Sequence, residues 1–336
     1  MHVSFAGALG RIDGWQQRSP MLAIPVAVIK KFVDDGVDTL GVQVAYWGFF
    51  SVFALLLAFA SILGFVFRSD PHLQRQLVSS TLERMPVIGP QISGHIGSLT
   101  GSGLALAIGV VGALWTGLGV TLAFGNALDR IWAVPHPQRA GYVSSRLRGL
   151  LVLASVGTVN VLATVAVGLV TAGGAGTVVT RVLGLIGSAV VDLVLFAASF
   201  RVLTAAEVTF RQVLPGALLA TGCWLALQAL GGVYVTRVLA GSSQTYGGFA
   251  AVVGLLTWLL IASELTLIAA ELNVVLARKL WPRSLTGELL TADKHALRAS
   301  AHAAQLDTRQ HITVTFRKHP GPQPRLEGND EAGGDA

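Results

Sequence analysis

Residues 46 to 67 read YWGFFSVFALLLAFASILGFVF, an unbroken run without a charged side chain. A helix needs about 20 mostly apolar residues to cross the roughly 30 Å hydrocarbon layer of a bilayer, so this stretch is long enough for one crossing. The pattern recurs along the chain, and the sequence predicts an all-α integral membrane protein with six transmembrane helices, at residues 46–67, 104–124, 150–170, 182–200, 217–239 and 250–276.

The overall composition supports a membrane protein. Hydrophobic residues make up 52% of the chain and charged residues only 12%, about half the charged fraction of a typical soluble domain. A soluble all-helical protein is the alternative, but its helices would be shorter and would show a polar face at 3.6-residue spacing.

The positive charges predict the orientation of the spans. Cytoplasmic flanks retain Lys and Arg, and one side of the predicted bundle carries most of them, while the opposite connections hold only Arg68, Arg75, Arg84 and Arg181. The richer side includes Arg11, Arg18, Lys30, Lys31, Arg130, Arg139, Arg146, Arg148, Arg201, Arg211, Arg278, Lys279 and Arg283. Both termini are therefore expected in the cytoplasm. Because these charges flank spans, the pI of about 9.9 predicts membrane lipids as partners and no nucleic acid.

Three regions lie around the spans. Residues 1–45 are expected to form a cytoplasmic segment with an amphipathic helix over 21–40, whose alternative is an ordinary packed helix beside the membrane. The external connection 68–103 predicts two short amphipathic helices, either a lid or a merely structural link. Residues 46–276 form the transmembrane domain. Residues 277–336 form a cytoplasmic tail, with a helix over 286–306, a short strand over 311–316 and disorder from about 318.

Small residues recur at every fourth position of the second predicted span. Between helices in lipid, small side chains allow the backbones to approach closely. The sequence therefore predicts a helix-packing ridge made of Ala105, Gly109, Ala113, Gly117, Thr121 and Gly125.

Ionisable residues within the spans are the strongest functional signal. A charge at the bilayer centre costs about 2.5–3.5 kcal/mol on insertion scales, so each one needs a reason to be there. Asp192 lies near the middle of the fourth predicted span and Glu264 near the middle of the sixth. We expect a polar site for a substrate or a proton formed by Asp192, Glu264, Asn160, Gln228 and Thr257.

A second group of polar residues is expected at the cytoplasmic face, and it consists of Glu271, Asn273, Arg201, Arg211 and Glu207. For Glu271 the favoured interpretation is structural, with Arg201, Arg211 or Arg278 as its partner. A lipid-modifying enzyme would require a catalytic cluster at the membrane interface, and Glu207, Arg211 and Glu271 are the cytoplasmic cluster that the sequence offers for it.

Templates for cofactors and catalysis are missing from the sequence. His295, His302, His311 and His319 do not have the spacing of a zinc site, and Cys223 is a single cysteine, so no metal is expected. The sequence contains no P-loop, no HExxH and no GxSxG pattern. No catalytic residue and no cofactor are predicted.

Several segments, specific only in combination, together resemble the YihY/BrkB family of bacterial inner-membrane proteins over roughly residues 30 to 280. They are Ala45-Tyr46, Trp115-Thr116, Asn126-Ala127-Leu128, Ile131-Trp132, Leu214-Pro215-Gly216-Ala217, Trp224, Tyr246-Gly247, Trp258 and Ala270-Glu271-Leu272-Asn273. The family often has proline where Ala54 stands and glycine where Ala270 stands. Of these motif residues, the resemblance adds Pro215, Gly216 and Trp258 to the candidate site residues.

The resemblance implies a multi-pass protein of the bacterial inner membrane that is linked to envelope integrity. It suggests a transporter-like protein for a lipid or another amphipathic or lipid-linked envelope component. A structural scaffold and a membrane-bound lipid-modifying enzyme are the alternatives, and a homo-oligomer is left open. The family also carries an old label as a ribonuclease, which we do not expect because the clustered metal ligands of such an enzyme are missing.

Overall fold

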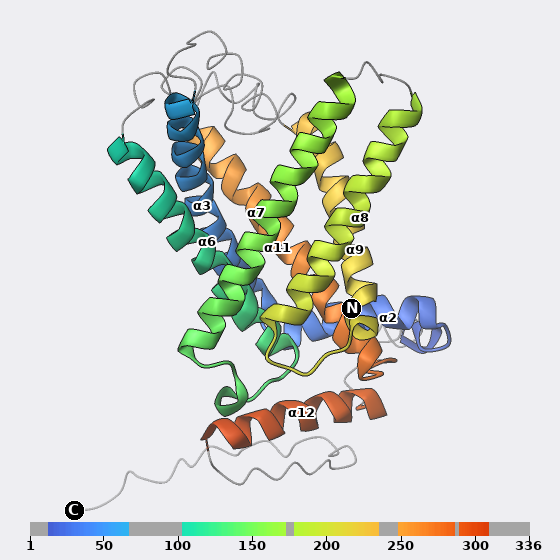
Figure 1. The fold of residues 1–336 in the computed structure, drawn as a ribbon. Helices are drawn as coiled ribbons and strands as arrows, with labels where there is room; N and C mark the ends of the chain where they lie inside the picture. The colour runs from blue at the N-terminus through green and yellow to red at the C-terminus, as the bar shows by residue number, and fades with distance from the viewer. Residues whose placement is uncertain (1–12, 67–102, 173–177, 235–247, 286–288, 309–336) are drawn as a thin grey trace, which may run out of the picture.

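The computed structural model describes residues 13–66, 103–172, 178–234, 248–285 and 289–308, and every regular element among them is helical. Six long helices run side by side (Figure 1). They are α3 (Val37–Val66), α6 (Gly103–Ile131), α7 (Tyr142–Ala172), α8 (Val178–Leu203), α9 (Phe210–Tyr234) and α11 (Gly248–Ala277). Three shorter elements accompany them: α2 (Pro20–Asp34), the 3₁₀ helix η2 (His136–Gln138) and α12 (Thr291–Thr308).

Five of the long helices within the described residues are long and apolar enough to cross a membrane. The qualifying segments are Val37–Ala58, Leu106–Ile131, Gly184–Leu203, Phe210–Gly231 and Val252–Ala277. The helix α7, whose second half is only partly described, is not among them. The chain is thus a helical protein with several candidate spans. The long external connection, the predicted strand at 311–316 and the last residues of the tail lie outside the described residues.

The six long helices form a ring in chain order. Each packs against the next, from α3 to α6, α7, α8, α9 and α11, and α11 packs back against α3. We call one end of this ring the base. It holds α2, α12 and the connections α6–α7 and α8–α9, and the helices spread apart toward the opposite end (Figure 1).

The main hydrophobic core lies at the base. Its buried side chains come from the base ends of all six long helices, such as Leu40 of α3, Leu128 of α6, Phe200 of α8 and Leu267 of α11. A second small cluster joins α2 to α11 through Ala27, Val28 and Val275. Within the described residues, aliphatic burial therefore ties the ring together at this end.

The first two helices are separated by a sharp turn. Pro20 stands in the first turn of α2, where its missing N–H costs nothing, and Gly36 adopts a left-handed φ of 61° just after the helix ends. The chain then enters α3 at Val37. The helix predicted over 21–40 is therefore wrong beyond Asp34, and the helix of the first span begins at Val37, before residue 46. The sequence did not predict this turn because the polar residues Asp38 and Gln43 interrupt the apolar run at the beginning of α3.

The predicted ridge of α6 contacts several neighbours rather than one. A Cβ at Gly109 would lie 2.6 Å from the backbone nitrogen of Ala58, so α3 and α6 touch there. Gly117 instead faces Leu153 of α7, and Gly125 faces Leu203 at the end of α8. Thr121 lies against Gly149 of α7. Ala113 is partly buried, and the side chain of Ala105 is outside the described residues.

Candidate functional site

Glu271 is fully buried at the base and forms an ion pair with Lys31 of α2. The Lys31 Nζ lies 2.9 Å from Glu271 Oε2 and also donates to the carbonyl of Ile131, at 2.8 Å. The contact with Glu271 has the distance of an ion pair but not the angles of a hydrogen bond, so within the described residues both carboxylate oxygens lack a hydrogen-bond donor. A buried carboxylate held only by charge is costly to leave unpaired.

The partner of Glu271 differs from the three arginines expected from the sequence. The helix α2 folds under the ring and packs on α11, which brings Lys31 to the carboxylate. Arg278 is engaged elsewhere, because its Nη2 donates to the carbonyl of Trp132 at 2.6 Å. A signal for Lys31 was present in the sequence: Ala23, Ala27 and Lys31 are four residues apart and form the buried face of α2.

The motifs around Pro215 and Asn273 meet where α9 crosses α11. Asn273 Oδ1 accepts a hydrogen bond of 2.6 Å from the backbone N–H of Gly216. A Cβ at Gly216 would lie 2.1 Å from the carbonyl oxygen of Ala269, closer than any side chain allows. Pro215 precedes this contact inside the helix, where it removes one backbone donor. These motif residues are thus joined in a tight helix crossing beside Glu271.

Asp192 and Glu264 have a different environment from Glu271. Both side chains are partly exposed, and within the described residues neither forms a hydrogen bond or an ion pair. Glu264 lies against Gly41 of α3, where an added Cβ would be 3.2 Å from Glu264 Cγ. Because Gly41 is close to the start of α3, Glu264 lies nearer the base than its position in α11 suggested.

The structure does not join Asp192 to Glu264 by a described contact. Asp192 belongs to α8 and Glu264 to α11, and α9 packs against both of these helices. Gln228 of α9 is exposed, and the exposed Thr257 donates to the carbonyl of Val253 in its own helix, at 2.9 Å. Trp258 is partly buried, and the side chain of Asn160 lies outside the described residues.

The charged group expected at the cytoplasmic face divides into separate places at the base. Glu207 and Arg201 line an open pocket together with Arg148, a residue that the sequence analysis did not select. Arg211 is exposed but does not line this pocket, and Glu271 is buried against Lys31. Glu207, Arg211 and Glu271 therefore do not share one site.

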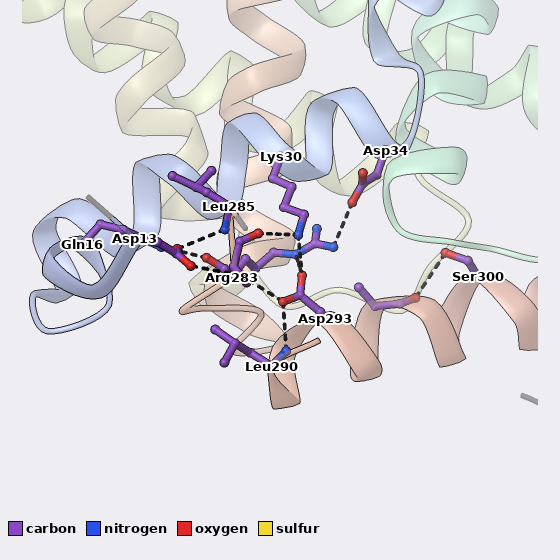
Figure 2. Close-up of polar contacts among 11 residues, drawn as sticks. Asp13, Gln16, Lys30, Asp34, Arg283, Leu285, Leu290, Asp293 and Ser300 are labelled. Carbon is purple, nitrogen blue, oxygen red and sulfur yellow. Dashed lines mark hydrogen bonds and ion pairs between the residues drawn. The ribbon is translucent and has the colours of Figure 1, made fainter. Parts of the chain in front are cut away.

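A network of polar contacts fastens α12 to the base (Figure 2). Asp293 Oδ1 accepts from Lys30 Nζ and Arg283 Nε, both at 2.9 Å, and its Oδ2 accepts from the backbone of Ser284 at 3.1 Å. Arg283 Nη2 also donates to Asp34 at 2.8 Å. Burial raises the pKa of Asp293, but the hydrogen bonds from Lys30, Ser284 and Arg283 outweigh it, so the net pKa is below its ordinary value.

The first described residues join the same network. Asp13 Oδ1 accepts from Gln16 Nε2 at 2.9 Å and from the backbone of Leu285 at 3.0 Å. Gln16 Nε2 also donates to the carbonyl of Arg283 at 2.8 Å. Segments from both ends of the sequence are therefore bound to each other under the ring. In the described part of the chain, no group of three or more His, Cys, Asp or Glu residues has a metal-binding arrangement.

Comparison with known proteins supplies the family. The chain is 29% identical over 92 residues to a protein of Bacillus subtilis (strain 168) named ribonuclease-like protein YfkH, which corresponds to 27% of this chain and 33% of that protein. The chain thus spans about a third of that relative. No solved structure matches. The sequence model of the virulence factor BrkB family matches residues 28–288, from within α2 to just beyond Arg283, and the chain therefore belongs to the BrkB family.

Proposed function

We propose that this protein is a six-span inner-membrane protein that moves or accommodates an amphipathic or lipid-linked envelope component. Asp192 and Glu264 would contact the polar part of that molecule or a coupling proton. The single observation that carries the proposal is the contrast among three carboxylates on the candidate spans. Glu271 is fully buried and paired, whereas Asp192 and Glu264 are partly exposed and have no partner among the described residues.

The cost of charge in lipid explains why that contrast is informative. An ionised carboxylate within a membrane needs a partner, water or a ligand. Lys31 meets this need for Glu271. For Asp192 and Glu264, a polar cavity that admits water, a proton or a headgroup would meet it.

The arrangement of the ring supports the same proposal. Its aliphatic core is drawn from the base ends of the helices, and the helices spread apart away from the base (Figure 1). Helices that are fixed to one another at one end are suited to a change in separation at the other. The core would then act as the fixed end.

The proposed orientation places the base in the cytoplasm. Lys30 and Lys31 belong to α2, Arg201 to the last turn of α8, and Arg278 directly follows α11, so all four lie at or beside the base. Cytoplasmic flanks are rich in Lys and Arg. The first and last described elements also lie there, as six crossings require. In this orientation α2 lies along the membrane surface, with Met21, Ile29 and Val33 exposed on one side of the helix and directed toward lipid.

Substitution of the two carboxylates tests the proposal. We expect Asp192→Asn and Glu264→Gln to remove the envelope function in a strain that lacks the native protein, while membrane abundance stays unchanged. The assay compares envelope permeability with the amount of protein in the membrane. Glu271→Gln is the control, because it should lower abundance. Loss of abundance in the Asp192 and Glu264 variants would contradict the proposal and favour a structural role for these residues.

A scaffold is the second candidate, because the network around Asp293 fixes α12 under the ring (Figure 2). Such a helix could present the tail to a partner protein. If deletion of residues 289–336 removes the envelope function while Asp192→Asn and Glu264→Gln retain it, the scaffold is favoured. We do not propose an enzyme, since the family match brings no reaction with it and the ribonuclease-like name belongs to a relative that aligns over a short segment.

A further inference from the structure

The connection between α8 and α9 surrounds an open pocket of about 660 Å³ at the base. Its wall consists of Arg148 from α7, the last turns of α8, the connecting residues 204–209 and Phe210 of α9. The candidate spans of these two helices end at Leu203 and begin at Phe210. The pocket therefore lies where two spans leave the hydrocarbon layer, which is the depth of lipid headgroups. We call it the α8–α9 pocket.

The wall of the α8–α9 pocket is held in place by polar contacts. Asp129 Oδ1 accepts a hydrogen bond of 2.6 Å from the backbone N–H of Ala205, and Arg148 Nη1 donates to the carbonyl of Thr204 at 3.2 Å. At the far end of the connection, the N–H of Thr209 donates to Gln212 Oε1 at 2.8 Å. Because the connection is fixed at three points, little ordering would be needed when a ligand binds.

The charged side chains of the pocket have donors available for an anion. The Arg201 guanidinium lies over the ring of Phe210, with 4.3 Å between its Cζ and the ring centroid. Within the described residues Arg201 makes no hydrogen bond or ion pair. Arg148 uses one donor for Thr204, out of the five that a guanidinium has. Two guanidinium groups beside one pocket are well suited to a phosphate.

Glu207 adds the opposite charge to the same wall. Its side chain is exposed, and it makes no ion pair with a described residue. The pocket thus presents two cations and one anion, which matches a headgroup that carries both a phosphate and an amine. The carboxylate of Asp129 is near Arg148 but lines the smaller neighbouring cavity and is engaged by Ala205.

Apolar side chains continue from the pocket toward the membrane. Leu151 lies almost one turn beyond Arg148 along α7 and is 58% exposed, and Val194 lies two turns before Arg201 along α8 and is 59% exposed. Leu214 follows Phe210 by one turn on α9 and is also exposed. These side chains would contact acyl chains below a bound headgroup, a surface that free phosphate does not use.

We propose that the α8–α9 pocket binds the headgroup of a phospholipid from the leaflet at the base, with its phosphate on Arg148 and Arg201 and its amine at Glu207. This site is separate from Asp192 and Glu264. Lipid binding here does not depend on whether the protein transports anything.

Lipid binding to the purified full-length protein tests the proposal. Native mass spectrometry would compare phosphatidylethanolamine with phosphatidylglycerol of the same acyl chains, and inorganic phosphate would serve as a competitor. We expect Arg201→Gln to weaken the binding of both lipids about tenfold, because a charge-assisted hydrogen bond is lost. Glu207→Gln should weaken only phosphatidylethanolamine. Arg146→Gln is the matched control, because Arg146 lies on α7 over the ring of Tyr142 and does not line the pocket.

Each arm has an outcome that contradicts the proposal. Unchanged lipid binding in Arg201→Gln, or the same loss in Arg146→Gln, would overturn the phosphate site. An equal loss of both lipids in Glu207→Gln would overturn the amine contact. Displacement of lipid by millimolar inorganic phosphate would show that the site recognises free phosphate instead. If Arg201→Gln fails to fold, the exposed Glu207→Gln variant still decides whether a headgroup amine is recognised.

Discussion

The carboxylates at the base of the ring and those further along the helices differ in whether they have a partner of opposite charge. At the base, the buried carboxylates of Glu271 and Asp293 pair with Lys31 and Lys30 of α2, while the exposed Arg201 and Glu207 of the α8–α9 pocket make no ion pair with a described residue. Beyond the base, Asp192 and Glu264 have no partner among the described residues. In that part α3 and α6 approach each other closely through the small residues Gly109 and Ala58.

The difference supports a separate proposal for each carboxylate. Full burial of a charge is tolerated only with a partner, so a buried and paired carboxylate indicates a fixed structural contact. A partly exposed carboxylate within a span needs water or a ligand to offset its charge, and this is the basis of the function proposed for Asp192 and Glu264. We therefore expect stability to depend on the base, and the proposed envelope function on Asp192 and Glu264.

The pair of Lys31 and Glu271 should give the largest effect on stability. Lys31→Met leaves Glu271 buried without a counter-charge, and we expect a loss of about 3–5 kcal/mol in the free energy of unfolding. The double variant Lys31→Met with Glu271→Leu should recover part of that loss, because the fully buried carboxylate is removed while Asp35, which also pairs with Lys31, is left without its partner. Unfolding of the detergent-solubilised protein measures both.

Lys30→Met is the control for that experiment, since Lys30 is adjacent in sequence but its side chain is 28% exposed in its pair with Asp293. A more exposed pair contributes less. If Lys30→Met and Lys31→Met lower the free energy of unfolding equally, the buried pair of Lys31 and Glu271 is no more important for stability than the other ion pairs of the base.

The crossing of α9 and α11 should give the next largest effect. Gly216→Ala would place a Cβ 2.1 Å from the carbonyl oxygen of Ala269, so the two helices must separate, and we expect a loss of about 1–3 kcal/mol. Gly222→Ala is a matched control on the same helix, because nothing lies within 4 Å of its added Cβ. The midpoint of thermal unfolding compares them. A Gly222→Ala variant as unstable as Gly216→Ala would contradict tight packing as the cause.

The helical membrane class could be predicted from the sequence because a long run of apolar residues indicates a helix that is surrounded by lipid. The apolar runs at 104–124, 182–200 and 250–276 all lie within long helices. A tail helix is also present, as α12, although it begins at Thr291 rather than 286. These features depend on local composition, which can be read from the sequence without knowledge of the fold.

The contacts of the candidate residues could not be predicted in the same way. Lys31 is far from Glu271 in sequence, and only the turn at Gly36 and the packing of α2 on α11 bring them together. Arg148 likewise lines the α8–α9 pocket only because the connection between two other helices lies beside it and its Thr204 carbonyl accepts a hydrogen bond from Arg148. The sequence shows which charges lie within the predicted spans, but the pairing of those charges depends on how the elements fold back on one another.

The attachment of α12 to the base should give the smallest effect and a dependence on pH. The pKa of Asp293 is lower in the folded protein than its ordinary value, so its ionised form stabilises the attachment above about pH 4. That contribution is lost as the pH falls below this value toward the folded pKa. Asp293→Asn should weaken the attachment at pH 7 by roughly 1–2 kcal/mol and remove this step. Spin labels at Gln138 of η2 and Ser300 of α12, in a Cys223→Ser background, would report the distance between the two elements. A distance that stays constant from pH 7 to pH 3, or an Asp293→Asn variant with the same pH profile as the native chain, would show that this carboxylate does not hold α12 against the base.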